Sequence, residues 1–175
     1  MRRRQALAAL AGLGLTGGSL WVVQQGLPGS QSSAGTRLPL TVETLDARGS
    51  SAGQTTVPTP DRVTVVDLFA TWCAPCDEQL AILAPLAEEY PDVSFVSVTN
   101  ERPSETLTRA DIAAWWNEHG GAWTVGLDPG SELLSAFNAT GLPYIAITDP
   151  SGAVVYGHGG LAGGATLRQE LDAVV

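Results

Sequence analysis

The feature that most constrains this sequence is an apolar run that ends in two cysteines, residues 63–76, VTVVDLFATWCAPC. Its first seven residues are mostly β-branched or aromatic, which favours a buried strand over Val63–Phe69. Cys73 and Cys76 follow closely, with only two residues between them. We therefore predict a buried strand that leads into a cysteine turn at the start of a helix.

The rest of the sequence alternates between strand and helix patterns. Apolar residues after the second cysteine recur at helical spacing, and the apolar run 93–99 follows that helix. A strand, a helix and a second strand in this order predict a right-handed parallel crossover, and hence an α/β domain. Residues 40–45 and 55–57 are expected to pair as an N-terminal β-hairpin. The further predicted elements are helices at 77–89, 108–119, 131–138 and 166–175 and strands at 123–127, 143–148 and 154–156.

The N-terminal segment, residues 1–23, has the pattern of an export signal or a membrane anchor. Arg2, Arg3 and Arg4 precede a span without charges, residues 6–23, which as a helix would measure about 27 Å, near the thickness of the hydrocarbon core. The arginine pair also resembles a twin-arginine export signal. A cleaved signal and a retained anchor are both open, and both place the rest of the chain outside the cytoplasmic membrane.

One folded domain is expected behind that segment. Residues 24–37 are rich in glycine, serine and glutamine and predict a flexible tether. The domain itself is expected over 38–175, a length that can bury a single hydrophobic core. We therefore divide the chain into a signal or anchor, a tether and one domain.

The charge balance excludes some classes of partner. Eighteen acidic residues stand against nine basic ones, which gives a net charge of −9, and all nine basic residues are arginine. Because binding to phosphate needs clusters of lysine or arginine, we do not expect the domain to bind nucleic acid. An acidic composition without lysine resembles proteins of salt-loving microbes. A halophilic source is therefore expected, and the domain should then lose stability in millimolar salt.

The two cysteines have the spacing of a small redox-active disulfide. A thiolate at the N-terminus of a helix is favoured by the unpaired backbone N–H groups there, so Cys73 is the predicted nucleophile. It would attack the disulfide of another protein, and Cys76 would then attack the mixed disulfide and release the product. Pro75 fits the first helical turn, where its missing N–H costs little. This chemistry needs no cofactor beyond the Cys73–Cys76 disulfide.

Three other interpretations of the cysteine pair are open at this point. A purely structural disulfide is disfavoured because closing so short a loop constrains the unfolded chain little. A zinc site is disfavoured because four ligands are usual, no second cysteine pair exists, and His119 and His158 lie far along the chain. A non-catalytic carrier of a metal such as copper is disfavoured because no histidine or methionine lies near the pair. We therefore predict no metal site.

Residues 66–76, VDLFATWCAPC, are similar to the active-site strand and turn of thioredoxins. Pro85 matches the proline inside that family's helix, and residues 141–148, GLPYIAIT, resemble its cis-proline loop. The resemblance implies a thioredoxin fold, with a central mixed sheet flanked by helices. The sequence alone would treat Pro143 as an ordinary trans proline at the start of a strand. The resemblance implies instead a cis bond that faces the cysteines.

Several features resemble one branch of the thioredoxin superfamily, the extracytoplasmic TlpA-like proteins. These features are the N-terminal segment, the hairpin and an insertion after the second core strand, between Asn100 and Leu127. Members of that branch reduce or exchange disulfides in exported proteins, often during cytochrome c maturation. The resemblance thus implies a thiol-disulfide oxidoreductase. Its partners would be protein disulfides, a thiol electron donor such as a membrane reductase, and the membrane itself through the N-terminus.

Asp67 lies six residues before the first cysteine in an otherwise apolar strand, where an isolated carboxylate should have a raised pKa. It could be a hydrogen-bonded core acid or face solvent, but the resemblance implies a proton acceptor and donor for the second cysteine. The predicted catalytic residues are Cys73, Cys76, Asp67 and Pro143. For Trp72, directly before the first cysteine, a position in the core is open as well as one at the surface. The residues predicted to contact the substrate are Trp72, Ala74, Pro75 and Leu142.

Two acidic residues, Asp77 and Glu78, follow the turn directly. They suit the helix dipole but oppose a thiolate at the helix start, so we predict a reducing rather than a strongly oxidising potential. Three other tryptophans are expected in the core, His119 at a helix C-terminus and His158 in an exposed loop. The core tryptophans in this prediction are Trp115, Trp116 and Trp123.

Overall fold

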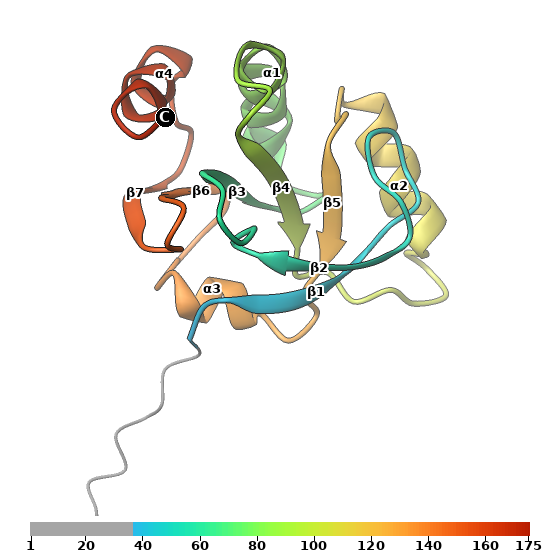
Figure 1. Ribbon diagram of the computed structural model, residues 1–175. Helices are drawn as coiled ribbons and strands as arrows, with labels where there is room; N and C mark the ends of the chain where they lie inside the picture. Colours follow the sequence, from blue (N-terminus) through green and yellow to red (C-terminus); the bar gives the residue numbers. More distant parts are fainter. Residues whose placement is uncertain (1–36) are drawn as a thin grey trace, which may run out of the picture. The chain divides into compact units, whose positions relative to one another are not determined.

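The computed structural model describes residues 37–175, and Figure 1 shows their arrangement. The predicted signal or anchor at 1–23 and almost all of the predicted tether at 24–37 lie outside the described residues. Within 37–175, none of the helices combines the length and the hydrophobicity needed to cross a membrane.

A seven-stranded mixed sheet forms the centre of the described domain, in the order β2-β1-β5-β4-β3-β6-β7. β3, β4 and β5 run parallel, and the other neighbouring strands pair antiparallel. This arrangement confirms the predicted mixed sheet and the predicted N-terminal hairpin. The strands are β1 (Leu40–Thr44), β2 (Gly53–Val57), β3 (Thr64–Phe69), β4 (Ser94–Thr99), β5 (Thr124–Leu127), β6 (Tyr144–Thr148) and β7 (Val154–Gly159).

Helices cover both faces of the sheet, as Figure 1 shows. Because strand side chains alternate between the two faces, Val65 and Phe69 of β3 pack in one core cluster together with residues of α1, α2 and α4. Val66 and Leu68 point the other way and pack in a second cluster with residues of α3. The helices are α1 (Ala74–Glu89), α2 (Arg109–Glu118), α3 (Glu132–Ala136) and α4 (Gly164–Asp172).

β3 is the strand around which both cores form. Each of its six residues is buried, because β4 and β6 flank it and helices cover it on both sides. α1 begins at Ala74, three residues earlier than the apolar spacing predicted, and contains Pro85 in its interior. The insertion between β4 and β5 contains α2, whose start is closed by reciprocal hydrogen bonds between Thr108 and Asp111.

The prediction of an exposed loop at His158 is wrong in one respect. His158 is exposed, but it lies in β7 and pairs with Ile145 of β6. The glycines around it favoured a loop. The structure gives one of them a packing reason: a Cβ atom on Gly157 would lie 2.7 Å from the hydroxyl of Tyr144. The sheet edge therefore continues through a segment whose composition indicated a turn.

Candidate active site

The cysteine turn connects the end of β3 to the start of α1. The backbone N–H of Cys73 donates to the carbonyl of Ala70 (3.1 Å), and that of Cys76 donates to the carbonyl of Cys73 (2.8 Å). Cys73 is the N-cap residue of α1, and a proline, Pro75, lies in the first turn. The two sulfurs are bonded to each other, with 5.3 Å between the Cα atoms. The turn thus holds the pair as a disulfide at a helix N-terminus.

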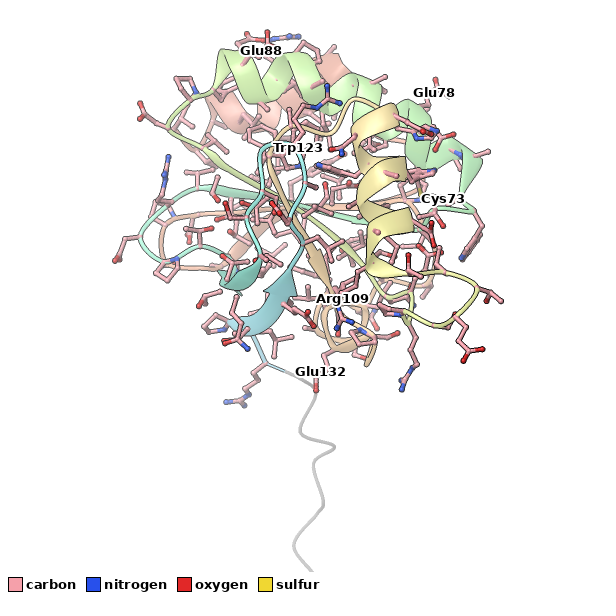
Figure 2. The ribbon with its side chains drawn as sticks, turned by 90° about the vertical axis from the view of Figure 1, so that its right-hand side faces the viewer. Cys73, Glu78, Glu88, Arg109, Trp123 and Glu132 are labelled. Carbon is pink, nitrogen blue, oxygen red and sulfur yellow. A yellow bond between two sulfur atoms is a disulfide. The ribbon has the colours of Figure 1, made fainter. Side chains whose placement is uncertain are left out.

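The two cysteines differ in their surroundings. Cys73 is 5% exposed and Cys76 is fully buried, so Cys73 is nearer to solvent. Trp72 is 74% exposed, which excludes the core position that the sequence left open for it. Ala74 and Pro75 are exposed as well. Figure 2 shows Cys73 at the start of α1 and Trp123 in the interior of the domain.

Asp67 lies on the same side of the sheet as the cysteines. Its side chain shares the face of Val65 and Phe69, which belong to the cluster that contains both cysteines. The Ser97 hydroxyl donates to Asp67 Oδ2 (2.8 Å), while Oδ1 is buried and has no hydrogen-bond partner among the described residues. Burial raises the pKa of Asp67 to about 7, and the hydrogen bond from Ser97 partly offsets this effect.

The structure excludes one of the open interpretations of Asp67. A solvent-facing strand position is excluded, because the residue is 1% exposed. The position of a hydrogen-bonded core acid agrees with the structure, because Ser97 donates to one carboxylate oxygen; the other oxygen has no partner among the described residues. Asp67 is thus a buried, hydrogen-bonded acid whose second oxygen has no partner in residues 37–175. A carboxyl group with a pKa of about 7 can exchange a proton at neutral pH.

Pro143 lies directly before β6, next to the end of β3. β6 pairs with β3 so that Tyr144 is opposite Leu68. This register directs the segment just before β6 toward the cysteine turn, which follows β3. The bond between Leu142 and Pro143 is cis, as the resemblance implied. Leu142 is half-buried and packs against both core clusters.

A carboxylate that sequence reasoning missed holds the turn from the side of β4. Glu101, two residues after β4, accepts the backbone N–H of Thr71 (2.8 Å) on Oε2 and the Thr71 hydroxyl (2.7 Å) on Oε1. The hydroxyl of Thr99 also donates to Oε2 (3.0 Å). Glu101 thus fixes the residue just before Trp72 through both carboxylate oxygens. A possible signal was its place after a parallel strand, since such strand ends commonly form sites.

The start of α1 also contacts α2. Asp77 is half-buried and Glu78 is exposed. Nε2 of His119 lies 3.7 Å from Asp77 Oδ2, and its Nδ1 donates to the carbonyl of Trp115 (2.7 Å), because a carbonyl can only accept. The His119 ring stacks on Trp115, which stacks in turn on Phe69. The sequence placed His119 only at a helix end and gave no sign of this contact.

The other predictions concern the core and metal binding. Trp116 and Trp123 are buried, as predicted, and Trp115 is half-buried. Within residues 37–175, no three side chains of the His, Cys, Asp and Glu types come close enough together to hold a metal ion. The electron-carrying group that the described site contains is the Cys73–Cys76 disulfide.

Comparison with known sequences gives one family and several partial relatives. Residues 33–169 match the family model described as Redoxin. Over 54 residues the chain is 33% identical to Thioredoxin-2 of Saccharomyces cerevisiae, which covers 31% of this chain and 52% of that protein. Over 133 residues it is 23% identical to the thiol:disulfide interchange protein CycY of Rhizobium leguminosarum, covering 72% of this chain and 68% of CycY. The chain thus spans about half or less of the length of the first thioredoxins that it matches.

Solved structures support the fold. The dsbF protein of MTB matches with a TM-score of 0.67 and 20% identity, over 80% of this chain and 98% of dsbF. A putative thiol:disulfide interchange protein DsbE from Chlorobium tepidum matches with a TM-score of 0.61 and 19% identity, over 78% of this chain and 99% of DsbE. The exposed lipoprotein thioredoxin Etrx1 of Streptococcus pneumoniae matches with a TM-score of 0.65 and 19% identity, over 78% of this chain and 99% of Etrx1. At these identities the likeness concerns the fold, which is the predicted thioredoxin-like one.

Proposed function

The chain belongs to the Redoxin family, and on that premise we propose that it is a thiol-disulfide oxidoreductase that acts on other proteins. The observation that carries the proposal is the asymmetry of the disulfide. Cys73 is 5% exposed and lies at a helix N-terminus beside exposed residues, whereas Cys76 is fully buried on the side of the sheet that holds Asp67. A disulfide that only stabilised the fold would need no such difference.

The proposed reaction begins with the reduced dithiol. The thiolate of Cys73 attacks a sulfur of the substrate disulfide, and the substrate's other sulfur leaves as a thiolate that takes up a proton. Cys76 then loses its proton to the Asp67 carboxylate and attacks the Cys73 sulfur. The Cys73–Cys76 bond forms, the bond between Cys73 and the substrate breaks, and the second substrate sulfur leaves as a thiolate that takes up a proton, while Asp67 releases the proton it took from Cys76. The protein has given two electrons and two protons, and an external thiol donor restores it by the same exchange in reverse.

The structure supports separate roles for the two cysteines. The unpaired N–H groups and the dipole of α1 favour a thiolate at Cys73, and its position beside exposed residues lets another protein reach it. Cys76 is closed off from solvent. Its natural target is therefore the sulfur of Cys73, with which it already forms a bond in the oxidised state.

The surface around Cys73 is proposed to bind the substrate. Trp72, Ala74 and Pro75 form an exposed group around the nucleophile, and large exposed aromatic side chains are common anchors in protein interfaces. Leu142 and the cis Pro143 border the turn from β6. We propose that they pair with the backbone of the bound substrate.

We further propose that the protein works outside the cytoplasmic membrane on exported proteins, with cytochrome c maturation as one such process. The arginine-rich start and the uncharged span at 6–23 support this location. Two proteins of similar fold are extracytoplasmic: Etrx1 of Streptococcus pneumoniae is an exposed lipoprotein, and a disulfide oxidoreductase of Mycobacterium tuberculosis is secreted. A membrane reductase would then be the electron donor. The lysine-free acidic composition supports a halophilic source.

Turnover of a protein disulfide tests the proposed activity. The full chain should accelerate reduction of insulin by dithiothreitol, and Cys73→Ser should abolish this acceleration. Cys76→Ser should accumulate a mixed disulfide with the substrate, because the resolving thiol is missing; Cys73→Ser serves as the matched control that accumulates none. Stoichiometric retention of copper without any turnover would contradict the proposal and favour a metal carrier.

A further inference from the structure

Three buried polar groups form a chain of hydrogen bonds behind the cysteine turn. The indole N–H of Trp123 donates to Ser97 Oγ (3.0 Å), and Ser97 Oγ donates to Asp67 Oδ2 (2.8 Å). Trp123, next to β5, is 8% exposed, Ser97 of β4 is fully buried, and Asp67 of β3 is 1% exposed. Two members thus lie in the neighbouring strands β3 and β4 and the third directly precedes β5, and the strand register places Ser97 directly beside Asp67.

The donors and acceptors in this chain have a fixed direction. An indole N–H can only donate, so Ser97 must accept from Trp123. A hydroxyl has a single proton, and the oxygen of Ser97 already faces one donor. The Ser97 proton is therefore directed at Asp67 Oδ2. A proton on Oδ2 itself would face the Ser97 proton, whereas Oδ1 has no partner among the described residues.

We propose that Ser97 and Trp123 are positioning residues for proton transfer: together they keep Asp67 Oδ2 occupied as an acceptor, so that Oδ1 is the atom that takes and returns the proton of Cys76. The inference rests on the proposed function, because it concerns the same resolving step. In that step the S–H bond of Cys76 breaks and an O–H bond forms at Oδ1. The hydroxyl and indole protons stay in place, and no electron moves to or from Asp67.

Ser97 and Trp123 determine which oxygen of Asp67 carries the proton, a role that a charged neighbour of Asp67 could otherwise have. No basic side chain is buried in residues 37–175. The titratable groups near the start of α1 on this side of the sheet are the half-buried Asp77 and His119, which lie 3.7 Å apart. Asp128 is the other buried acid in residues 37–175, but its carboxylate accepts the backbone N–H of Leu133 in α3, which packs on the opposite face. Ser97 is accordingly the one hydrogen-bond donor to the Asp67 carboxylate within the described domain.

The titration of Asp67 in the oxidised full chain tests the inference without any substrate. The carboxyl ¹³C shift of Asp67 should give a midpoint near 7 in the wild type. Ser97→Ala should move this midpoint up by about one pH unit, because a donor to the charged form is lost. Trp123→Phe should move it up by a smaller amount, because the hydroxyl is no longer held in one direction.

Trp116→Phe is the matched control. Trp116 lies in the same core, but its indole N–H donates to the backbone carbonyl of Arg48 (3.1 Å) and not to Ser97 or Asp67. Trp116→Phe should leave the midpoint of the Asp67 titration unchanged. Ser97→Thr, which keeps a hydroxyl, should titrate with the midpoint of the wild type. The inference is overturned if Trp123→Phe, like the control Trp116→Phe, gives the same midpoint as the wild type.

The rate of disulfide exchange gives the second readout. A midpoint one unit higher lowers the carboxylate fraction about tenfold at pH 6, so Ser97→Ala should slow exchange by about that factor at pH 6 and little at pH 9. A rate lowered equally at both pH values would show a merely structural effect and contradict the inference. A wild type with the expected titration but no exchange activity would instead refute the proposed function and leave the hydrogen-bond relay standing.

Discussion

The two halves of the cysteine turn differ in their surroundings. On the outer half, Cys73 lies beside an exposed tryptophan, and Glu101, in the segment after β4, accepts a hydrogen bond from the backbone of Thr71. On the inner half, Cys76 is fully buried on the face of the sheet where Asp67 and Ser97 form a polar network inside an apolar core. In the proposed mechanism, the outer half presents an exposed apolar surface to another protein, and the inner half transfers a proton away from water.

This difference teaches where the turn can tolerate change. Contacts on the outer half are partly solvated, so altering them should affect substrate binding more than folding. Groups on the inner half have no access to water, so altering their charge should affect the stability of the domain and its pH dependence. The following predictions go from the largest expected effect to the smallest.

Asp67→Asn tests the energetic weight of the inner half. The pKa of Asp67 is about 7 in the fold against an ordinary 3.8, so the folded state favours the protonated acid. Its stabilising contribution is complete below about pH 4 and is lost as the pH rises through 7. Asparagine does not titrate. The stability of the variant relative to the wild type should thus rise by about 4 kcal/mol between pH 4 and pH 8.

Urea unfolding of both oxidised proteins at several pH values measures this change. Titrations elsewhere in the chain cancel in the comparison, because the two proteins differ only at residue 67. A stability difference that is independent of pH would mean that the Asp67 carboxyl has an ordinary pKa.

Glu101→Gln tests whether the outer half depends on its anchor. The Glu101 carboxylate accepts hydrogen bonds from Thr71 on both oxygens. The amide of glutamine has a single acceptor oxygen, and its NH₂ group would face one of the two donors of Thr71. We expect a loss of about 2 kcal/mol in the free energy of unfolding. The reaction of Cys73 with a substrate disulfide should also slow. Glu105→Gln, at an exposed position of the same loop, is the control. Equal stability of both variants would exclude the anchoring role.

Trp72→Ala tests the outer half as a docking surface. The side chain is 74% exposed, so its removal should change the free energy of unfolding by less than about 0.5 kcal/mol. The KM for a protein disulfide should rise about tenfold, as expected for an interface anchor, while the rate with a small disulfide reagent stays the same. An equal loss with both substrates would argue against docking through this residue.

Asp77→Asn tests the smallest effect, that of the negative charge next to the turn on the reduction potential. Removing its charge should favour the Cys73 thiolate and hence the reduced form. The reduction potential should become less negative by about 10 mV, and the difference should shrink in molar salt. Glu88→Gln, at the far end of α1 (Figure 2), is the control that should leave the potential unchanged. A shift in the opposite direction would contradict this account of the potential.

Local patterns were enough to predict the parts of the fold that lie close together in the sequence. The apolar run and the cysteine spacing predicted β3 and the helix start, since both depend on neighbouring residues. Asp67 could be singled out because a carboxylate is out of place in an apolar strand. The resemblance to thioredoxins added the cis bond before Pro143, which the residues alone did not indicate.

The partners of these residues could not be predicted, because they depend on strand register. Ser97 lies beside Asp67 only because β3 and β4 pair in one particular alignment, and no local pattern fixes it. Trp123 was correctly expected in the core, but the direction of its indole N–H follows from the same register. Glu101 lies in an insertion whose path the sequence did not define. His158 was misplaced because glycine is a turn signal that an edge strand can override.

The most direct test of the central claim is the pH dependence of the resolving step in Asp67→Asn. Reduced protein is mixed with 5,5′-dithiobis(2-nitrobenzoate); Cys73 releases one chromophore on attack, and Cys76 releases the second on resolution. We predict that the second phase of the wild type rises through an inflection near pH 7. In Asp67→Asn this inflection should be absent and the second phase at least tenfold slower at pH 7. An identical rate and an identical pH profile in the two proteins would contradict proton transfer through Asp67.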